Sequence, residues 1–191
     1  MSDATSTAVW PPSVRVRIVT GGFIERLAAA DIGATYNFYR AGGRALLLRG
    51  RLERYLDERE RAALLLVGEA PGYRGTRVSG IPLTSERQLT GDGPAEATAT
   101  VVHHVLADLG CEDDVLLWNA VPTHPGDSAS NRRPTRGEVA AGVSFARELA
   151  VRRRVVAVGR VAHDALGGMY VRHPSHGGAT AFRRGLERLL S

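Results

Sequence analysis

The chain of 191 residues contains no lysine, and all 25 of its basic residues are arginine. A Walker-type phosphate-binding loop needs a lysine for the β- and γ-phosphates, so the chain is not a standard nucleotide triphosphatase of that type. Catalysis through a lysine Schiff base is excluded for the same reason.

Cysteine is nearly absent as well, because Cys111 is the only one. A single cysteine excludes a disulfide framework within the chain and suits a reducing cytoplasm. It also excludes an iron–sulfur cluster or a structural zinc site held only by cysteines of one chain. We therefore expect no metal site and no cofactor.

Long apolar runs are missing, and none approaches the roughly 20 residues that a bilayer-spanning helix needs. The first 13 residues lack a basic segment followed by an apolar one, so they do not form a secretory signal. They are rich in Ser, Thr and Ala, which predicts a disordered leader over residues 1–13. One domain is expected over residues 14–191. We expect a monomer in the bacterial cytoplasm, without membrane contact.

Positive charge exceeds negative charge, and it is unevenly spread. The formal net charge is +5, and residues 131–191 hold 12 arginines against 4 acidic residues. The preceding part of the chain is therefore slightly acidic. A basic C-terminal third suggests a polyanionic partner such as nucleic acid. A solvated, arginine-rich surface is the alternative.

Short apolar runs alternate with amphipathic segments along the chain. The apolar runs predict strands over residues 64–67, 115–122, 153–159 and 169–171. The amphipathic segments predict helices over residues 21–32, 44–61, 95–109, 135–150, 161–166 and 181–190, the fourth starting at a capping box of Thr135 and Glu138. This alternation predicts a three-layer α/β/α sandwich with a central parallel sheet of about four strands.

An aromatic connector, Tyr36-Asn37-Phe38-Tyr39-Arg40, precedes two glycines. Exposed aromatic rings beside arginines can stack nucleic-acid bases. Such residues more often pack one layer of a protein on another. The sequence leaves both roles open.

Polar residues stand at three of the predicted strand ends. Glu69 follows the first strand in a turn rich in Gly and Pro, Asn119 lies near the end of the second, and His173 follows the fourth. Ligands of open α/β sheets bind at the carboxyl edge of the strands. An asparagine amide there offers a donor and an acceptor, which complement the imide edge of a pyrimidine. The alternatives are a solvated carboxylate for Glu69 and a loop-capping amide for Asn119.

The order of these segments resembles that of the uracil-DNA glycosylase superfamily over about residues 64–190. Gly68-Glu69-Ala70-Pro71-Gly72 is similar to the first motif of its thermophile-type branch. The segment 116–121 resembles the strand whose asparagine reads uracil, and His173-Pro174-Ser175 resembles the closing motif. Segments 131–134 and 156–162 also fit the thermophile-type pattern.

The resemblance implies a monofunctional DNA glycosylase of base excision repair, which hydrolyses the N-glycosidic bond of a base flipped out of DNA. The base would be uracil or a related deaminated or modified base. Glu69 would orient water and stabilise the cationic sugar. His173 would hydrogen-bond the oxyanion of the leaving base. Asn119 would hold the imide edge and reject cytosine.

The resemblance also implies two sets of contacts with uracil- or lesion-containing DNA, single or double stranded. The base would contact Asn119, Ala70, Gly72, Tyr73 and Leu83. The DNA backbone would contact Arg74, Arg132, Arg133, Ser175, His176, Gly177 and Gly178.

The chain departs from the family pattern at several positions. It lacks the four cysteines of the thermophile-type iron–sulfur cluster. Leu83 stands where the family has a base-stacking phenylalanine, and Ala70 where the classical branch has an aspartate. Gly72 replaces the tyrosine with which that branch blocks the methyl group of thymine. Thymine, hypoxanthine and 5-modified uracil therefore stay open as substrates.

Other functions stay open beside this one. Leu83 and Ala70 would also suit a catalytically weak or inactive homologue that binds DNA without cleaving it. An α/β enzyme acting on free nucleosides is a further alternative. Residues 131–135 carry no inserted histidine, so crosslinking to abasic DNA is not expected.

Overall fold

A parallel sheet of four strands lies at the centre of the molecule. The computed structural model describes residues 20–190, so the predicted leader over residues 1–13 lies outside this range, and the single domain over residues 14–191 stays a prediction. The strand order is β2-β1-β3-β4, and all neighbours are parallel. The strands are β1 (Leu64–Gly68), β2 (Val115–Asn119), β3 (Arg154–Val158) and β4 (Met169–Val171).

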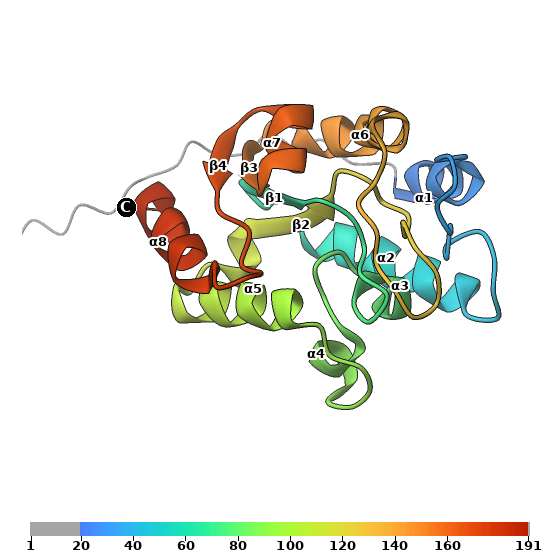
Figure 1. The fold of residues 1–191 in the computed structure, drawn as a ribbon, viewed down its shortest axis with the longest axis horizontal. Coiled ribbons are helices and arrows are strands. Elements are labelled where there is room, and N and C mark those ends of the chain that lie inside the picture. Colours follow the sequence, from blue (N-terminus) through green and yellow to red (C-terminus); the bar gives the residue numbers. More distant parts are fainter. Residues whose placement is uncertain (1–19, 191) are drawn as a thin grey trace, which may run out of the picture.

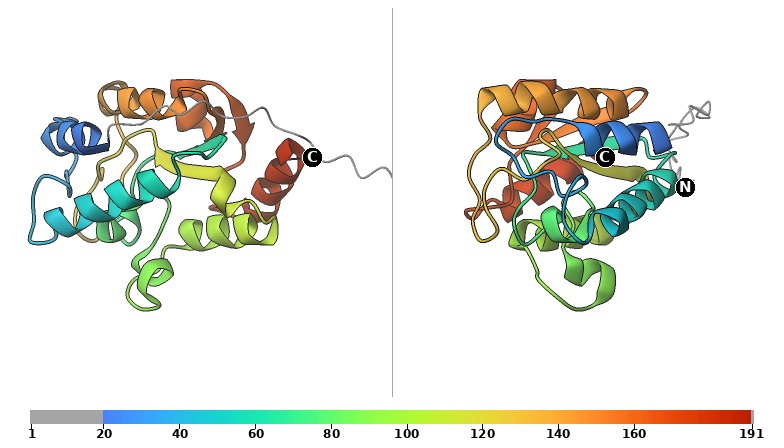
Figure 2. Two further views of the ribbon diagram at one scale, coloured as in Figure 1. Left: turned by 180° about the vertical axis from the view of Figure 1, so that it is seen from behind. Right: turned by 90° about the vertical axis from the view of Figure 1, so that its right-hand side faces the viewer.

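Helices cover both faces of this sheet (Figures 1 and 2). One face carries α1 (Thr20–Ala29), α6 (Arg136–Ala150) and α7 (Arg160–Leu166), and the other carries α2 (Ala45–Glu58), α5 (Ala97–Asp108) and α8 (Ala179–Leu190). The connections contain α3 (Thr76–Ser79), α4 (Glu86–Thr90) and the 3₁₀ turn η1 (Glu112–Asp114). The predicted three-layer α/β/α sandwich with four parallel strands is confirmed. Between residues 20 and 190, no helix is both long and apolar enough to cross a membrane.

The core fills the space between the sheet and each helical layer. Every residue of β1 and β2 is buried, as expected for parallel strands that are covered on both faces. Trp118 of β2 packs edge-on against Phe23 of α1, which packs in turn against Phe145 of α6, with 5.5 Å between ring centroids in both pairs. At the free edge of β2, the buried hydroxyl of Tyr55 accepts a hydrogen bond from the N–H of Leu117 at 2.7 Å.

Local chemistry sets where α6 begins. The Thr135 hydroxyl accepts a hydrogen bond from the N–H of Glu138 at 3.2 Å, and the Glu138 carboxylate accepts one from the N–H of Thr135 at 2.8 Å. This is the capping box expected from the sequence. The short helices α3 and α4 escape prediction, because four or five residues show no helical period of apolar side chains.

The aromatic connector after α1 is mostly packed inside the fold. Phe38 and Tyr39 are buried, and the Asn37 amide donates to the carbonyl oxygens of Leu27, Ala28 and Ala30 at 2.8–3.3 Å. These bonds satisfy the last carbonyls of α1, which therefore ends before the predicted residue 32. Tyr36 is the exception, since 39% of its surface is exposed.

Candidate active site

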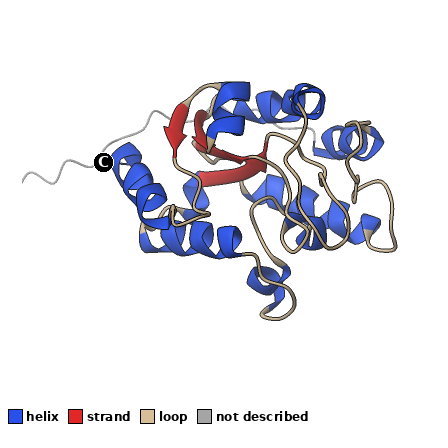
Figure 3. Cartoon of the chain, in the orientation of Figure 1, coloured by secondary structure: helices blue, strands red, loops and turns tan. Residues whose placement is uncertain are grey.

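The parallel register brings the three predicted functional residues to one edge of the sheet. Gly68 at the end of β1 pairs with Asn119 at the end of β2. Glu69 follows Gly68 directly, and His173 lies two residues beyond the end of β4. Along the carboxyl edge, the strand order therefore presents Asn119, Glu69, Gly159 and His173 in turn. In Figure 3 the long connection from β2 to α6 is drawn as loop throughout.

The inner strand β1 ends in Gly68, and Gly159 directly follows the inner strand β3, which leaves room for the outer side chains to lean inward. A Cβ added to Gly68 would lie 3.0 Å from Oδ1 of Asn119, and one added to Gly159 would lie 3.3 Å from Cβ of His173. Asn119 thus leans over β1, and His173 leans over β3. With strands roughly 4.8 Å apart, the two outer strands are separated by roughly 14 Å.

Asn119 carries the clearest sign of a ligand site. It is 1% exposed, and within residues 20–190 neither its Oδ1 nor its Nδ2 has a hydrogen-bond partner. An unpaired buried amide costs about 1–3 kcal/mol, so such a group in a folded protein needs an explanation. Leu83 packs beside it over Gly68, with a φ of 51° that is unusual for a bulky residue. Such strain is characteristic of functional sites.

His173 is arranged as a neutral hydrogen-bond donor. Its Nδ1 accepts a hydrogen bond from the N–H of Ser175 at 3.1 Å and lies 2.8 Å from the Ser175 hydroxyl. The proton of the neutral ring therefore sits on Nε2. Burial, assisted by the nearby His176, lowers the pKa of His173 below its ordinary 6.5, so the ring is uncharged at pH 7. Over residues 20–190, no partner bonds its Nε2.

Glu69 is half-buried and forms no ion pair within residues 20–190. Burial raises the pKa of its carboxyl above the ordinary 4.5, while the positive charge of Arg133 opposes this shift. The backbone around it pairs with the segment after β2, because the carbonyl of Glu69 accepts the N–H of Val121 at 3.0 Å. A second bond, from Ala120 to Gly68 at 2.9 Å, continues the pairing of the two loops.

The comparisons with known proteins decide the family. The model of the uracil DNA glycosylase superfamily matches residues 56–188, which is more than half of the chain. The chain belongs to the uracil DNA glycosylase superfamily. Members of this superfamily are DNA glycosylases, which are hydrolases. A search of curated proteins found no match to this chain.

One solved structure has a fold similar to that of this chain. It is the crystal structure of wild-type SMUG2 from Pedobacter heparinus, with a TM-score of 0.59 and 11% sequence identity. The alignment covers 88% of this chain and 98% of the SMUG2 chain. At this level of identity the likeness concerns the fold alone.

Within this uracil DNA glycosylase fold, His124 ties two loops of the site together. It is fully buried, with Nδ1 2.8 Å from the carbonyl oxygen of Pro71 and Nε2 2.8 Å from that of Asp127. Asn131 adds a second link, because its Oδ1 accepts the N–H of Tyr73 at 2.9 Å. These contacts join segments about 50 residues apart, so sequence patterns do not reveal them. Pro122 and Pro125, on either side of His124, are a local hint of a fixed loop.

Glu96 is a second carboxylate beside the loop after β1. Its carboxylate fills the space that a side chain at Gly72 or Gly75 would need. Burial raises its pKa above 4.5. Gly72, predicted to contact the base, is buried, and Ala70 packs against the core. Gly72 and Gly75 therefore leave room for the Glu96 carboxylate to lie close to the backbone of this loop. The sequence alone does not reveal this contact.

The predicted DNA-backbone contacts at the C-terminal side lie in one turn between β4 and α8. His176 and Gly177 have positive φ values of 52° and 73°, and the N–H of Gly178 bonds the carbonyl of Ser175 at 3.0 Å. A Cβ at Gly178 would collide with the carbonyl oxygen of His173. This turn therefore holds a fixed shape next to His173.

The predicted arginine contacts differ from one another in their surroundings. Arg74 and Arg133 are exposed, and the guanidinium of Arg74 lies 5.7 Å from the ring centre of Tyr73. Arg132 instead forms two bonds with the buried carboxylate of Glu138, at 2.6 and 2.8 Å. The charge of Arg132 is therefore committed to the start of α6. Within residues 20–190, no group of three or more His, Cys, Asp or Glu residues is arranged to hold a metal ion.

Proposed function

We propose that the protein is a monofunctional DNA glycosylase that hydrolyses the N-glycosidic bond of uracil, or of a related deaminated or modified base, flipped out of DNA. The observation that carries this proposal is the buried, unpaired amide of Asn119 at the sheet edge that also holds Glu69 and His173. Membership of the superfamily supports the reaction class. The absence of lysine agrees with hydrolysis rather than imine chemistry.

Asn119 recognises the base in this proposal. Its Oδ1 accepts the N3–H of uracil, and its Nδ2 donates to O4. Cytosine presents the reverse pattern, with an acceptor at N3 and a donor at N4. A mismatched edge would leave buried groups unpaired, at a cost of several kcal/mol in the transition state. Because the amide is buried beside Leu83, the base reaches it only when that side chain yields space.

His173 stabilises the leaving group. When the bond between C1′ and N1 breaks, its electron pair passes to the base, and O2 takes much of the negative charge. The Nε2–H of the neutral ring donates to O2 and stabilises this charge more in the transition state than in the substrate. The N–H of Ser175 holds the ring in the required tautomer.

Glu69 acts on the sugar and the water. Its ionised carboxylate stabilises the oxocarbenium-like sugar and accepts a hydrogen bond from the attacking water. The water oxygen bonds to C1′, and the proton that it loses passes through Glu69 to the departing base. Arg74, Arg133 and the turn over residues 175–178 hold the phosphates of the strand. Arg132 is left out of this set because Glu138 engages its guanidinium.

A labelled oligonucleotide with one uracil tests the proposal. We expect a product that alkali cleaves at the uracil position. A mobility shift without an alkali-labile product would indicate a homologue that only binds DNA. Release of base from free deoxyuridine, without an affinity for DNA that weakens with salt, would indicate a nucleoside enzyme. A panel with thymine, hypoxanthine and 5-modified uracil identifies the preferred base.

A further inference from the structure

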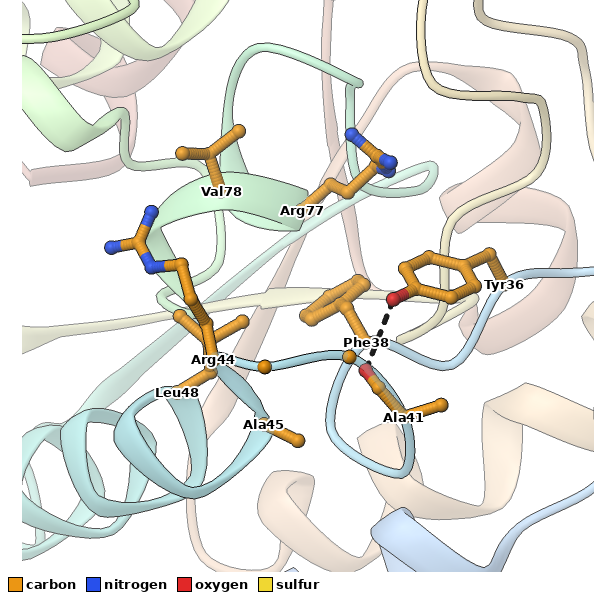
Figure 4. A pocket seen from close by; sticks show the side chains of 10 residues that line it. Tyr36, Phe38, Ala41, Arg44, Ala45, Leu48, Arg77 and Val78 are labelled. Atoms are coloured by element: carbon orange, nitrogen blue, oxygen red, sulfur yellow. Dashed lines mark hydrogen bonds between the residues drawn. The ribbon is translucent and has the colours of Figure 1, made fainter.

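A cavity of about 210 Å³ lies beside α3, and neither Glu69, Asn119 nor His173 lines it. Figure 4 shows the side chains that do. Its walls are the connector from Tyr36 to Gly43, the first turn of α2, and Arg77 and Val78 of α3. It is smaller than the roughly 300–1,000 Å³ of pockets that enclose drug-sized ligands. A single ring system therefore suits it better than an extended molecule.

Tyr36 gives the cavity a fixed aromatic wall. Its hydroxyl donates to the carbonyl oxygen of Ala41 at 3.0 Å, which holds the ring in place (Figure 4). Gly42 has a φ of 101°, and a Cβ there would lie 2.7 Å from the same hydroxyl. The chain thus turns closely under a ring that stays partly exposed, while Phe38 and Tyr39 of the same connector are buried.

Arg77 supplies a cation that no acidic residue of the described chain pairs with. Its guanidinium carbon lies 5.3 Å from the centre of the Tyr36 ring. Its Nε is buried and has no hydrogen-bond partner, and the described chain forms no ion pair with this side chain. A buried N–H without a partner is costly, so an acceptor from a ligand would stabilise it.

The rest of the cavity adds positive charge. None of its lining residues is acidic. Arg44 lies on the opposite wall and bonds Glu86 at 3.0 Å, but Arg51 also bonds Glu86 at 2.8 and 3.1 Å. One carboxylate is therefore shared by two guanidinium groups. The first turn of α2 has no side-chain cap, so its N-terminal dipole reinforces the positive potential.

A flat ring beside the guanidinium of Arg77, which forms no ion pair in the described chain, matches the chemistry of a nucleotide. Bases stack on tyrosine and on guanidinium planes, and phosphate oxygens accept hydrogen bonds from arginine. A phosphate or a free carboxylate alone would leave the aromatic wall unused.

Hydrogen bonds link the walls of the cavity to the candidate active site. Thr76 of α3 accepts the N–H of Leu83, which packs beside Asn119, and Arg77 is the next residue along the chain. On the other wall, the backbone of Tyr36 pairs with that of His124, at 2.9 and 3.0 Å. Both walls are therefore fixed to elements that build the site.

We propose that this cavity binds an unpaired nucleotide of the substrate strand that flanks the flipped base. The inference rests on the function proposed above and adds a strand preference to it. A base can stack on Tyr36 only when it is unpaired, so the protein favours single-stranded or locally opened DNA. The cavity contributes to binding and takes no part in breaking the bond.

A series of single-stranded oligonucleotides with one uracil, shortened by one nucleotide at a time from either end, tests the proposal. For the wild type, we expect KM to rise about tenfold when one particular flanking nucleotide is removed. Arg77→Gln and Tyr36→Leu are expected to bind the long strand about tenfold more weakly and to keep kcat. In both variants, the KM should no longer rise when that nucleotide is removed; this rise in KM is the length step. Tyr36→Phe retains the aromatic ring and is expected to show the same length step as the wild type.

Arg54→Gln is the matched control, because Arg54 is exposed on α2 and lies outside the cavity. It removes the same charge and is expected to keep the step. Thermal melting of each variant checks that the fold is intact. The proposal is overturned if Arg77→Gln and Tyr36→Leu show the same step as the wild type.

The proposed function and the cavity can fail separately. If no uracil is released, fluorescence anisotropy with the same labelled strands still measures whether affinity steps with length and whether Arg77→Gln removes the step. A free deoxynucleoside monophosphate is the other source of this ligand chemistry. If it binds saturably and needs Arg77, while strand length has no effect, the cavity is a mononucleotide site and the proposed strand contact is wrong.

Discussion

Single residues of the candidate site are held in states that cost stability. Asn119 is buried with both amide atoms unpaired, and Glu69 is half-buried without an ion pair in the described chain. Leu83 has a backbone conformation that bulky residues rarely adopt. Sites that bind and react commonly carry such costs, which the rest of the fold offsets.

Removing the Asn119 amide should not destabilise the fold. Asn119→Ala relieves a desolvation cost of about 1–3 kcal/mol and leaves a small void, so we expect stability between unchanged and about 2 kcal/mol higher. Urea denaturation measures this difference. Asn37→Ala is the control, because the Asn37 amide is fully bonded; it should lose about 1–3 kcal/mol. An equal loss in both variants would mean that Asn119 has a structural role.

The pH profile of excision should report Glu69. Its carboxyl must be ionised, and burial raises its pKa, so kcat/KM should fall with decreasing pH already above 4.5. His173, with a lowered pKa, is neutral at pH 7 and causes no loss of activity as the pH rises further. Arg133→Gln removes the charge that opposes the shift of Glu69, so the acid limb should move to higher pH at low ionic strength. In Arg184→Gln, the acid limb of the kcat/KM profile should stay at the pH of the wild type. If the acid limb does not move in Arg133→Gln either, Glu69 is not the group that titrates.

At the scale of secondary-structure elements, the start of α6 depends on one ion pair whose carboxylate is buried. Glu138 is 3% exposed and accepts bonds from Arg132 and from the N–H of Thr135. The bond from Arg132 is the main reason that the pKa of Glu138 falls to about 2. Its stabilising effect is complete above the ordinary pKa of 4.5 and is lost as the pH falls toward 2.

Glu138→Gln should therefore destabilise the fold by about 3 kcal/mol at pH 7. Urea denaturation at pH 7 and pH 3 should show that the difference from the wild type shrinks at the lower pH. Glu148→Gln, on the same helix, breaks an exposed pair with Arg26 and should cost at most about 1 kcal/mol. Equal losses of stability in the two glutamate variants would show that burial of the Glu138 carboxylate does not strengthen its ion pair.

Local signals explain which elements are predictable from the sequence. The capping box of α6 lies within four residues, and β4 is bounded by glycines on one side and by His173-Pro174 on the other. Their boundaries can therefore be predicted from the chain alone. Contacts such as His124 with Pro71, or Glu96 over Gly72, join loops that are distant in sequence. No periodic pattern records such a contact.

At the scale of the whole molecule, the strand order brings the residues of the candidate site together. Glu69, Asn119 and His173 are about 50 residues apart along the chain, and only the strand order places them on one edge. The sequence predicts that edge because parallel strands share their carboxyl ends. It does not predict that Gly68 at the end of β1 and Gly159 after β3 leave room for the outer side chains to lean inward, because this follows from the register.

The most direct test of the central claim is the single-turnover rate of uracil release from a labelled oligonucleotide, compared between the wild type, Asn119→Ala and His173→Ala. We predict that the wild type releases uracil and that each substitution lowers the rate by about tenfold to a thousandfold, with the fold retained. Near-wild-type rates in both variants, or no release by the wild type, would contradict the account.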